Sequence, residues 1–138
     1  MRYVLDSFAL LAYFGDEEGA DVVENIFNMA KKGEANVYMS YVNLGEVYYI
    51  IYREEGVDKA NETLALIKRL PIEFVEVNDK IALTAARVKA THRLSYADAY
   101  VVATAIDRDA EWLLVIPNSE MLMSRFFGFD NQVIKLYD

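Results

Sequence analysis

Short β-rich runs alternate with longer segments of helical periodicity along the chain, and this alternation constrains the fold more than any other feature. Strand–helix–strand units favour parallel pairing of the strands. The runs Val4-Leu5 and Leu113-Leu114-Val115-Ile116 are apolar throughout, as in strands covered on both faces. We predict a single α/β domain over residues 1–138, a three-layer α/β/α sandwich with a mainly parallel sheet of about five strands. The predicted strands are 2–5, 36–40, 72–77, 112–116 and 132–137, and the predicted helices are 7–14, 18–32, 42–55, 58–70, 79–93, 96–110 and 119–127.

The composition is typical of a cytoplasmic globular protein. With 138 residues, of which 54% are hydrophobic, the chain can bury a core without a metal or a disulfide. It contains no cysteine, which excludes disulfides, thiolate zinc sites and cysteine nucleophiles. No signal-peptide pattern precedes the first predicted strand, and no uncharged run approaches the roughly 20 apolar residues of a membrane span. We therefore expect a cytoplasmic protein with no membrane segment.

The charge distribution is uneven. A net charge of −8 argues against broad, sequence-independent binding of nucleic acid, because such affinity comes mainly from lysine and arginine. Residues 80–93 nevertheless contain no acid and run directly toward Asp98. Either this basic strip flanks a functional site, or it is a solvated helix face. Its charged candidates for phosphate contacts are Arg87, Lys89, His92 and Arg93.

Three carboxylates, Asp6, Glu46 and Asp98, each lie among apolar residues beside a predicted strand-to-helix junction. In parallel α/β sheets, ligands bind beyond the carboxyl ends of the strands, so one cleft can hold all three acids. Acids that share a site repel one another unless a cation compensates them. Mg²⁺ and Mn²⁺ prefer oxygen ligands. The pattern therefore predicts a metal-dependent phosphate chemistry.

Each acid also has a structural interpretation. Asp6 is placed to cap the following helix, and Ser95-Tyr96-Ala97-Asp98 matches a capping box. Glu46 lies inside its helix, where capping does not explain it. Helical spacing predicts one buried stripe on that helix and leaves Glu46 on another side that is also apolar, so Glu46 is expected to face protein, a partner chain or a pocket. The stripe consists of Leu44, Val47, Tyr48 and Ile51.

Several other chemistries are poorly supported. His92 is the only histidine, which excludes a histidine-rich metal site. The common glycine-rich nucleotide-binding loops are absent. A haloacid-dehalogenase-like phosphatase also places an aspartate after its first strand, but it normally has a second aspartate two residues later, where this chain has Phe8.

The ordered set of acidic motifs resembles the PIN domains, and most closely the VapC-type toxin ribonucleases. The matching segments are Val4-Leu5-Asp6-Ser7-Phe8-Ala9-Leu10-Leu11, Asn43-Leu44-Gly45-Glu46-Val47 and Leu94-Ser95-Tyr96-Ala97-Asp98-Ala99. The resemblance implies a Mg²⁺- or Mn²⁺-dependent endoribonuclease acting on RNA, with Asp6, Glu46 and Asp98 as catalytic and metal-binding residues. It also implies a homodimer and inhibition by an antitoxin protein. Ser7 and Ser95 would orient the acids or the attacking water.

One departure from the family pattern bears on the number of metals. A further acid commonly follows the fourth strand in a T-x-D pattern, but this chain has Ile116-Pro117-Asn118. Asn118 can coordinate a metal but carries no charge, and Glu120 is the nearest acid. Both are candidate metal ligands, and the choice between one metal and two stays open. The departure also supports an alternative, a non-catalytic PIN-like interaction module with a degenerate site.

Overall fold

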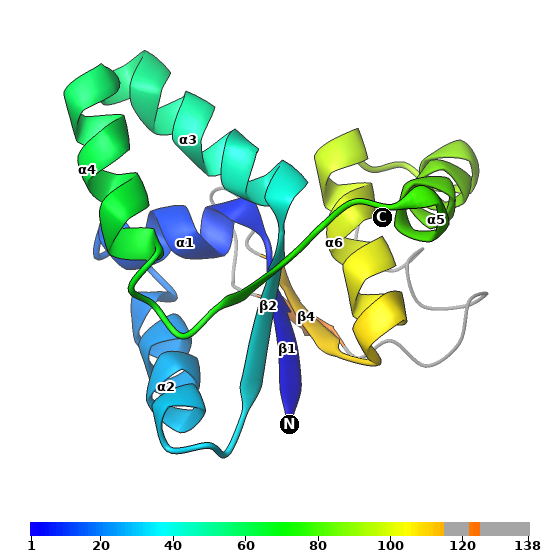
Figure 1. Ribbon diagram of the computed structural model, residues 1–138, viewed down its shortest axis with the longest axis horizontal. Helices are drawn as coiled ribbons and strands as arrows, with labels where there is room; N and C mark the ends of the chain where they lie inside the picture. Colours follow the sequence, from blue (N-terminus) through cyan, green and yellow to red (C-terminus); the bar gives the residue numbers. More distant parts are fainter. Residues whose placement is uncertain (115–121, 125–138) are drawn as a thin grey trace.

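The computed structural model of the chain describes residues 1–114 and 122–124. Its described strands form one five-stranded sheet in the order β3-β2-β1-β4-β5, with helices on both sides (Figure 1). The first four strands are parallel, and β5 pairs antiparallel with β4. Their bounds are β1 Arg2–Leu5, β2 Asn36–Ser40, β3 Glu73–Val75, β4 Glu111–Leu114 and β5 Leu122–Ser124.

Two apolar layers hold the sheet, one on each face. Along β1 the side chains alternate between them: Tyr3 and Leu5 pack into one core, and Val4 packs into the other. The first core lies under α1 Ser7–Phe14, α2 Ala20–Lys31, α3 Tyr41–Glu55 and α4 Val57–Ile67, and the second lies under α5 Asp79–Thr91 and α6 Tyr96–Arg108. The predicted three-layer α/β/α sandwich is therefore confirmed.

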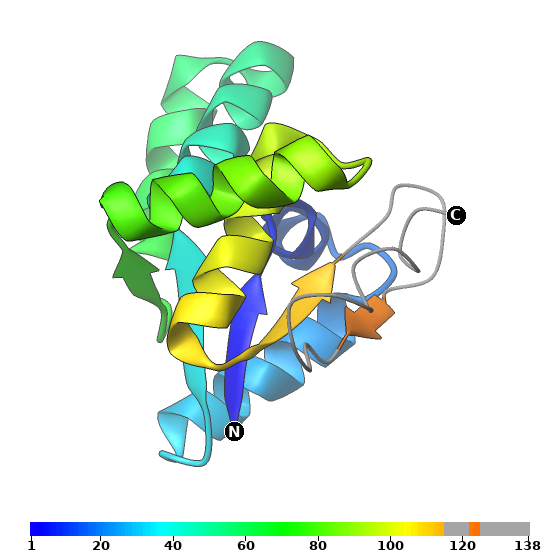
Figure 2. The same cartoon turned by 90° about the vertical axis from the view of Figure 1, so that its right-hand side faces the viewer.

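The strand order reverses direction at β1. The chain moves outward from β1 to β2 and β3, then returns through α5 and α6 to place β4 on the other side of β1. The arrowheads of β1 (blue), β2 (cyan) and β4 (orange-yellow) point the same way in Figure 2. Since α6 returns the chain toward the start of β4, it begins near the carboxyl edge of the sheet. Ligands of open α/β sheets bind at such a reversal, beyond the strand ends.

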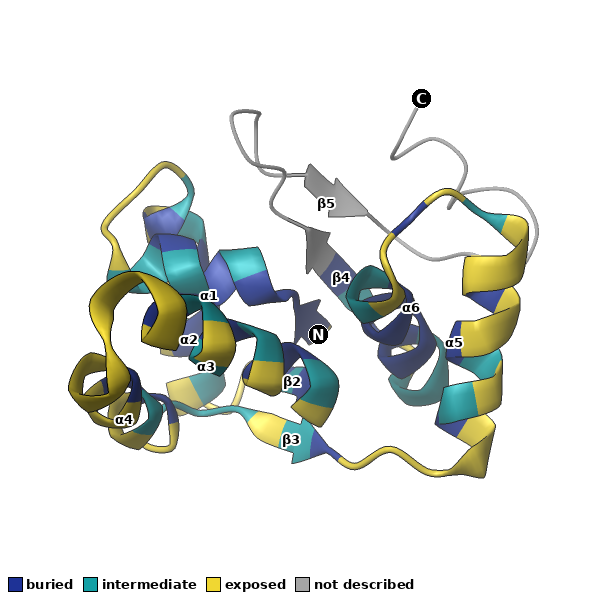
Figure 3. Ribbon diagram, turned by 90° about the horizontal axis from the view of Figure 1, so that it is seen from above, coloured by how far each residue is buried: buried dark blue, intermediate teal, exposed yellow. Residues whose placement is uncertain are grey.

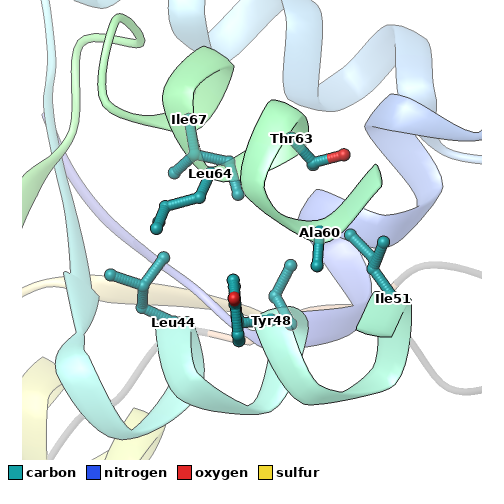
Figure 4. Close-up of a pocket in the computed structure, with 8 residues that line it drawn as sticks. Leu44, Tyr48, Ile51, Ala60, Thr63, Leu64 and Ile67 are labelled. Carbon is teal, nitrogen blue, oxygen red and sulfur yellow. The ribbon is translucent and has the colours of Figure 1, made fainter. Parts of the chain in front are cut away.

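The predicted apolar stripe on α3 packs against α4. Leu44, Val47 and Ile51 are buried, and Figure 4 shows side chains of α3 directed toward Ala60 and Leu64 of α4. The space between the two helices has no room for a water molecule. This packing fixes the rotation of α3 and directs Glu46 away from α4.

The predicted elements agree with the described ones from residue 2 to residue 114, apart from a few residues at their ends. The predicted helix 119–127 is wrong at residues 122–124, which form β5. Pairing of Leu113 with Met123 is a long-range contact that overrides local helical periodicity. The predicted strand 132–137 lies outside the described residues. None of the described helices has the length and apolarity needed to cross a membrane.

Candidate active site

Asp6 follows the last residue of the central strand β1 and caps α1. It is fully buried, and its Oδ1 accepts a hydrogen bond from the backbone N–H of Ala9 at 2.7 Å. The capping interpretation of Asp6 is thus confirmed. Capping does not exclude metal binding, because an ionised carboxylate has two oxygens and about four acceptor positions.

The cap makes a testable prediction about stability. Asp6→Ala should lower the free energy of unfolding by about 1 kcal/mol, because it removes the side-chain acceptor, whereas Asp6→Asn should stay close to wild type since asparagine caps helices equally well. Urea unfolding of the two variants in EDTA, followed by circular dichroism, measures the difference. Equal losses in both variants would show that the charge of Asp6, rather than its capping oxygen, stabilises the metal-free protein.

Asp98 lies in the first turn of α6 and is half-buried. The predicted strand-to-helix junction is wrong for Asp98, because α6 follows α5 rather than a strand. The N-cap of this helix is Ser95, whose Oγ accepts a hydrogen bond from the backbone N–H of Asp98 at 3.1 Å. The stripe formed by Val101, Val102 and Ala105 is buried, so α6 is held firmly against the sheet. A negative charge in the first turn is favourable because it interacts with the positive end of the helix dipole.

Glu46 lies in the second turn of α3 and is half-buried. Its helix starts directly after β2, where Ser40 accepts a hydrogen bond from the backbone N–H of Val42 at 3.2 Å. Glu46 is one helical turn beyond Asn43, which is fully buried. Residues three apart share a helix face, so the position of Asn43 determines where this face of α3 lies.

Asn43 connects the three elements that carry the acids. Its Nδ2 donates to the backbone carbonyl of Ala97 at 3.0 Å and to Ser7 Oγ at 3.4 Å, and the Ser7 hydroxyl donates to the backbone carbonyl of Asn43 at 3.2 Å. Ser7 follows Asp6 and Ala97 precedes Asp98 in the sequence. The view onto the sheet edge in Figure 3 places α1 and α3 on one side and α6 on the other. The fold thus brings the three acid-bearing segments to one edge.

The sequence alone does not identify this role of Asn43. The one sequence feature that indicates it is an amide side chain three residues before Glu46 on an otherwise apolar helix face. Such a residue needs hydrogen-bond partners when it is buried. Those partners lie 36 and 54 residues away, so sequence spacing alone does not identify them.

The donor set fits a hard divalent cation in chemical type, because all three candidate ligands are carboxylates. Their parent segments are tied together by the Asn43 hydrogen bonds. Among residues 1–114 and 122–124, however, no three Asp, Glu or His side chains lie close enough together to enclose a metal ion. Like charges repel, so carboxylates of one site converge only around a compensating cation. The other two candidate ligands, Asn118 and Glu120, lie outside the described residues.

The four candidate residues of the basic strip differ in their surroundings. Arg87 and Arg93 are exposed. The Lys89 ammonium donates to the carbonyl of Leu94 at 2.8 Å, which ties the end of α5 to the turn before α6. The half-buried His92 contacts the hydroxyl of its neighbour Thr91 through Nδ1 at 2.8 Å. Two of the four residues thus have structural contacts of their own.

Tyr100 lies two residues beyond Asp98 and is buried. Its hydroxyl is 3.3 Å from that of the exposed Tyr96. The hydrogen bond to Tyr96, and then burial, raise the pKa of Tyr100 above its ordinary value. Tyr100 therefore stays a neutral phenol at neutral pH and adds no further negative charge beside Asp98.

Comparison with known proteins gives one family. Residues 3–115 match the family model of the PIN domain, whereas no curated protein gives a significant match. The fold is similar to VapBC2 from Rickettsia felis bound to a fragment of promoter DNA, with a TM-score of 0.65 and 15% identity over 81% of this chain and 86% of that one. It is also similar to Mycobacterium tuberculosis VapC20, a toxin that cleaves the sarcin-ricin loop, with a TM-score of 0.61 and 17% identity over 80% and 85% of the two chains. A third similar structure is a toxin-antitoxin complex from Klebsiella pneumoniae, with a TM-score of 0.58 and 16% identity over 80% of this chain and 82% of that one.

Proposed function

The chain belongs to the PIN domain family, and we propose on this basis that it is a metal-dependent endoribonuclease that hydrolyses RNA phosphodiester bonds. The observation that carries the proposal is the convergence of three acid-bearing segments at the carboxyl edge of the sheet, joined through Asn43. That edge, at the reversal of strand order, is where α/β sheets bind ligands.

Asp6, Glu46 and Asp98 would hold the metal, Mg²⁺ or Mn²⁺, directly or through water. The chemistry that a bound ion would supply is activation of a water for attack on phosphorus and stabilisation of the leaving oxygen. The protein contributes by positioning the acids. Asp6 is oriented by the N–H of Ala9, and the Ser95 cap fixes the turn of α6 that carries Asp98. Ser7 acts on the site through Asn43 rather than by contacting the attacking water.

The test of this function is cleavage of a labelled single-stranded RNA by the purified chain with Mn²⁺, and again with excess EDTA. We expect the wild-type chain to cleave the RNA with Mn²⁺ but not in EDTA. The Asp98→Asn variant should not cleave it under either condition. The non-catalytic alternative rests on Asn118, which stands where the family pattern has an acid. Binding of RNA or protein without any metal-dependent cleavage would establish that alternative.

We further propose that the chain is the toxin of a toxin–antitoxin pair and forms a homodimer. The similar structures include antitoxin complexes, which supports a protein partner. On α3, Tyr41, Tyr49 and Tyr52 are each more than 40% exposed. The sequence predicts that apolar residues 41–52 and 126–129 exceed what one small sandwich buries, and residues 126–129 lie outside the described ranges.

The dimer is a testable expectation. Exposed aromatic side chains of this kind are enriched at interfaces, so light scattering should give twice the mass of one chain at micromolar concentration. Tyr49→Glu combined with Tyr52→Glu should shift the protein toward monomer, because charges are depleted in interface cores. A wild-type monomer from micromolar to millimolar concentration would overturn the dimer.

The exposed arginines give a prediction about RNA affinity. In a Glu46→Gln background, Arg87→Ala and Arg93→Ala should each weaken RNA binding and lower the slope of log affinity against log salt by about one unit, because each removes one phosphate contact. Fluorescence anisotropy at several salt concentrations measures both quantities. The control is Lys31→Ala, which removes an exposed positive charge at the end of α2. If Arg87→Ala and Arg93→Ala, like the Lys31→Ala control, keep the affinity and slope of the Glu46→Gln background, the strip is a solvated helix face.

A further inference from the structure

The buried side chain of Asn43 connects three helices. Its hydrogen bonds join α3 to Ser7 of α1 and to Ala97 of α6. The equally buried Thr104 donates to the carbonyl of Tyr100 at 2.7 Å, within its own helix. Loss of the Thr104 bond would leave α6 in place, whereas loss of the Asn43 bonds would disconnect three segments.

The orientation of the Asn43 amide follows from its surroundings. A carbonyl oxygen can only accept, so the group facing Ala97 O at 3.0 Å must be Nδ2. The Ser7 hydroxyl uses its single proton on the backbone carbonyl of Asn43, which leaves its oxygen to accept from Nδ2. Rotating the amide by half a turn would place Oδ1 against the carbonyl oxygen of Ala97 with no hydrogen between them.

The same orientation has a cost. Asn43 Oδ1 is buried and has no hydrogen-bond partner among the described residues. A buried acceptor without a partner disfavours folding, and native proteins contain few of them. An apolar side chain of similar size would avoid this loss. The presence of asparagine therefore suggests a role beyond packing.

We propose that Asn43 is a positioning residue that sets the relative placement of the metal-binding acids Asp6, Glu46 and Asp98, an inference that rests on the proposed function. Both residues that Asn43 contacts are neighbours of an acid in the sequence: Ser7 follows Asp6, and Ala97 precedes Asp98. Glu46 lies one turn beyond Asn43 on α3. A shift of α3 by a fraction of an ångström would move Glu46 relative to the other two. Residues that orient metal ligands commonly affect metal affinity about 10- to 100-fold.

The test measures binding of Mn²⁺ without RNA, by the loss of the electron paramagnetic resonance signal of free Mn²⁺. Asn43→Leu keeps the branched shape and removes both donated bonds, and Thr104→Val is the matched control because it also removes a buried hydrogen bond with little change of shape. We expect Asn43→Leu to weaken Mn²⁺ binding about 10- to 100-fold. Thr104→Val should bind as wild type does, even where its melting temperature falls equally.

Ser7→Ala keeps the inference testable if Asn43→Leu does not fold. It removes the bonds between Ser7 and Asn43 but leaves the bond to Ala97, so we expect a smaller loss of Mn²⁺ affinity, about severalfold. Wild-type affinity in a folded Asn43→Leu variant would overturn the inference, and so would wild-type affinity in Ser7→Ala where the leucine variant is unfolded. An equal loss in Thr104→Val would also overturn it.

Failure of the inference can be distinguished from failure of the proposed function. Asp98→Asn is measured in the same series. If Asp98→Asn loses Mn²⁺ affinity but folded Asn43→Leu does not, the three acids bind metal and only the role of Asn43 is wrong. If wild type and Asp98→Asn bind Mn²⁺ equally weakly, the metal site itself is absent, and both the proposed function and the inference fail.

Discussion

Glu46→Gln should lower the rate of Mn²⁺-dependent RNA cleavage about a thousandfold while leaving the fold unchanged. The substitution keeps the shape of the side chain but removes a charged metal ligand, and metal ions contribute several kcal/mol of transition-state stabilisation. Since each 1.36 kcal/mol changes a rate tenfold, about 4 kcal/mol gives this factor. Glu46 is half-buried and lies beyond the first turn of its helix, so no cap is lost. Initial rates on a labelled RNA, with circular dichroism of the same samples, measure both effects.

The control for this variant lies on the same helix. Glu54→Gln removes an exposed carboxylate near the end of α3 and should leave the rate unchanged. Asp6→Asn and Asp98→Asn should reduce the rate as strongly as Glu46→Gln. In EDTA, all three site variants should melt at or above the wild-type temperature, because removal of one like charge relieves repulsion. Full activity combined with a lower melting temperature would show that the acids are structural.

The layer order of the fold could be predicted because it depends on local patterns. Alternation of short apolar strands with amphipathic helices favours parallel βαβ units, and the three residues Tyr3, Val4 and Leu5 show why both faces are covered: they divide between two cores. The family could be identified from the order of its acidic motifs and is confirmed by the match over residues 3–115.

Two features of the structure depend on contacts that local sequence periodicity does not show. Residues 122–124 form a strand because β4 offers them an edge, which periodicity within 119–127 does not reveal. The Lys89 ammonium donates to the carbonyl of Leu94, a contact that its place in the basic strip does not reveal, while its contact with phosphate stays a prediction. A lysine near the end of a helix can extend into solvent or donate to a backbone carbonyl, and the path of the following turn determines which of these occurs.

The candidate site lies between these two cases. The place of Asp6 and Glu46 at the sheet edge follows from the strand-to-helix junctions before them, which are local features, whereas Asp98 follows the turn between α5 and α6. The relative placement of the acids depends on Asn43, whose partners come from α1 and α6. Such an arrangement exists only after the sheet and both helical layers have assembled, so no window of sequence contains it.

Trp112→Ala should destabilise the protein more than any other variant discussed, by about 3–5 kcal/mol. Trp112 is fully buried and belongs to the core between the sheet and α5 and α6, and it pairs with Val4 of the central strand. Truncation removes a large apolar surface and leaves a cavity beneath α6, the helix that carries Asp98. Trp112→Phe is the matched control and should lose less, because an aromatic ring still fills most of the space. Urea unfolding followed by circular dichroism gives the difference, since the tryptophan signal is lost in both variants. A loss below about 1 kcal/mol for Trp112→Ala would mean that β4 and α6 do not share a close-packed core, and the placement of Asp98 above the sheet edge would then lose its structural basis.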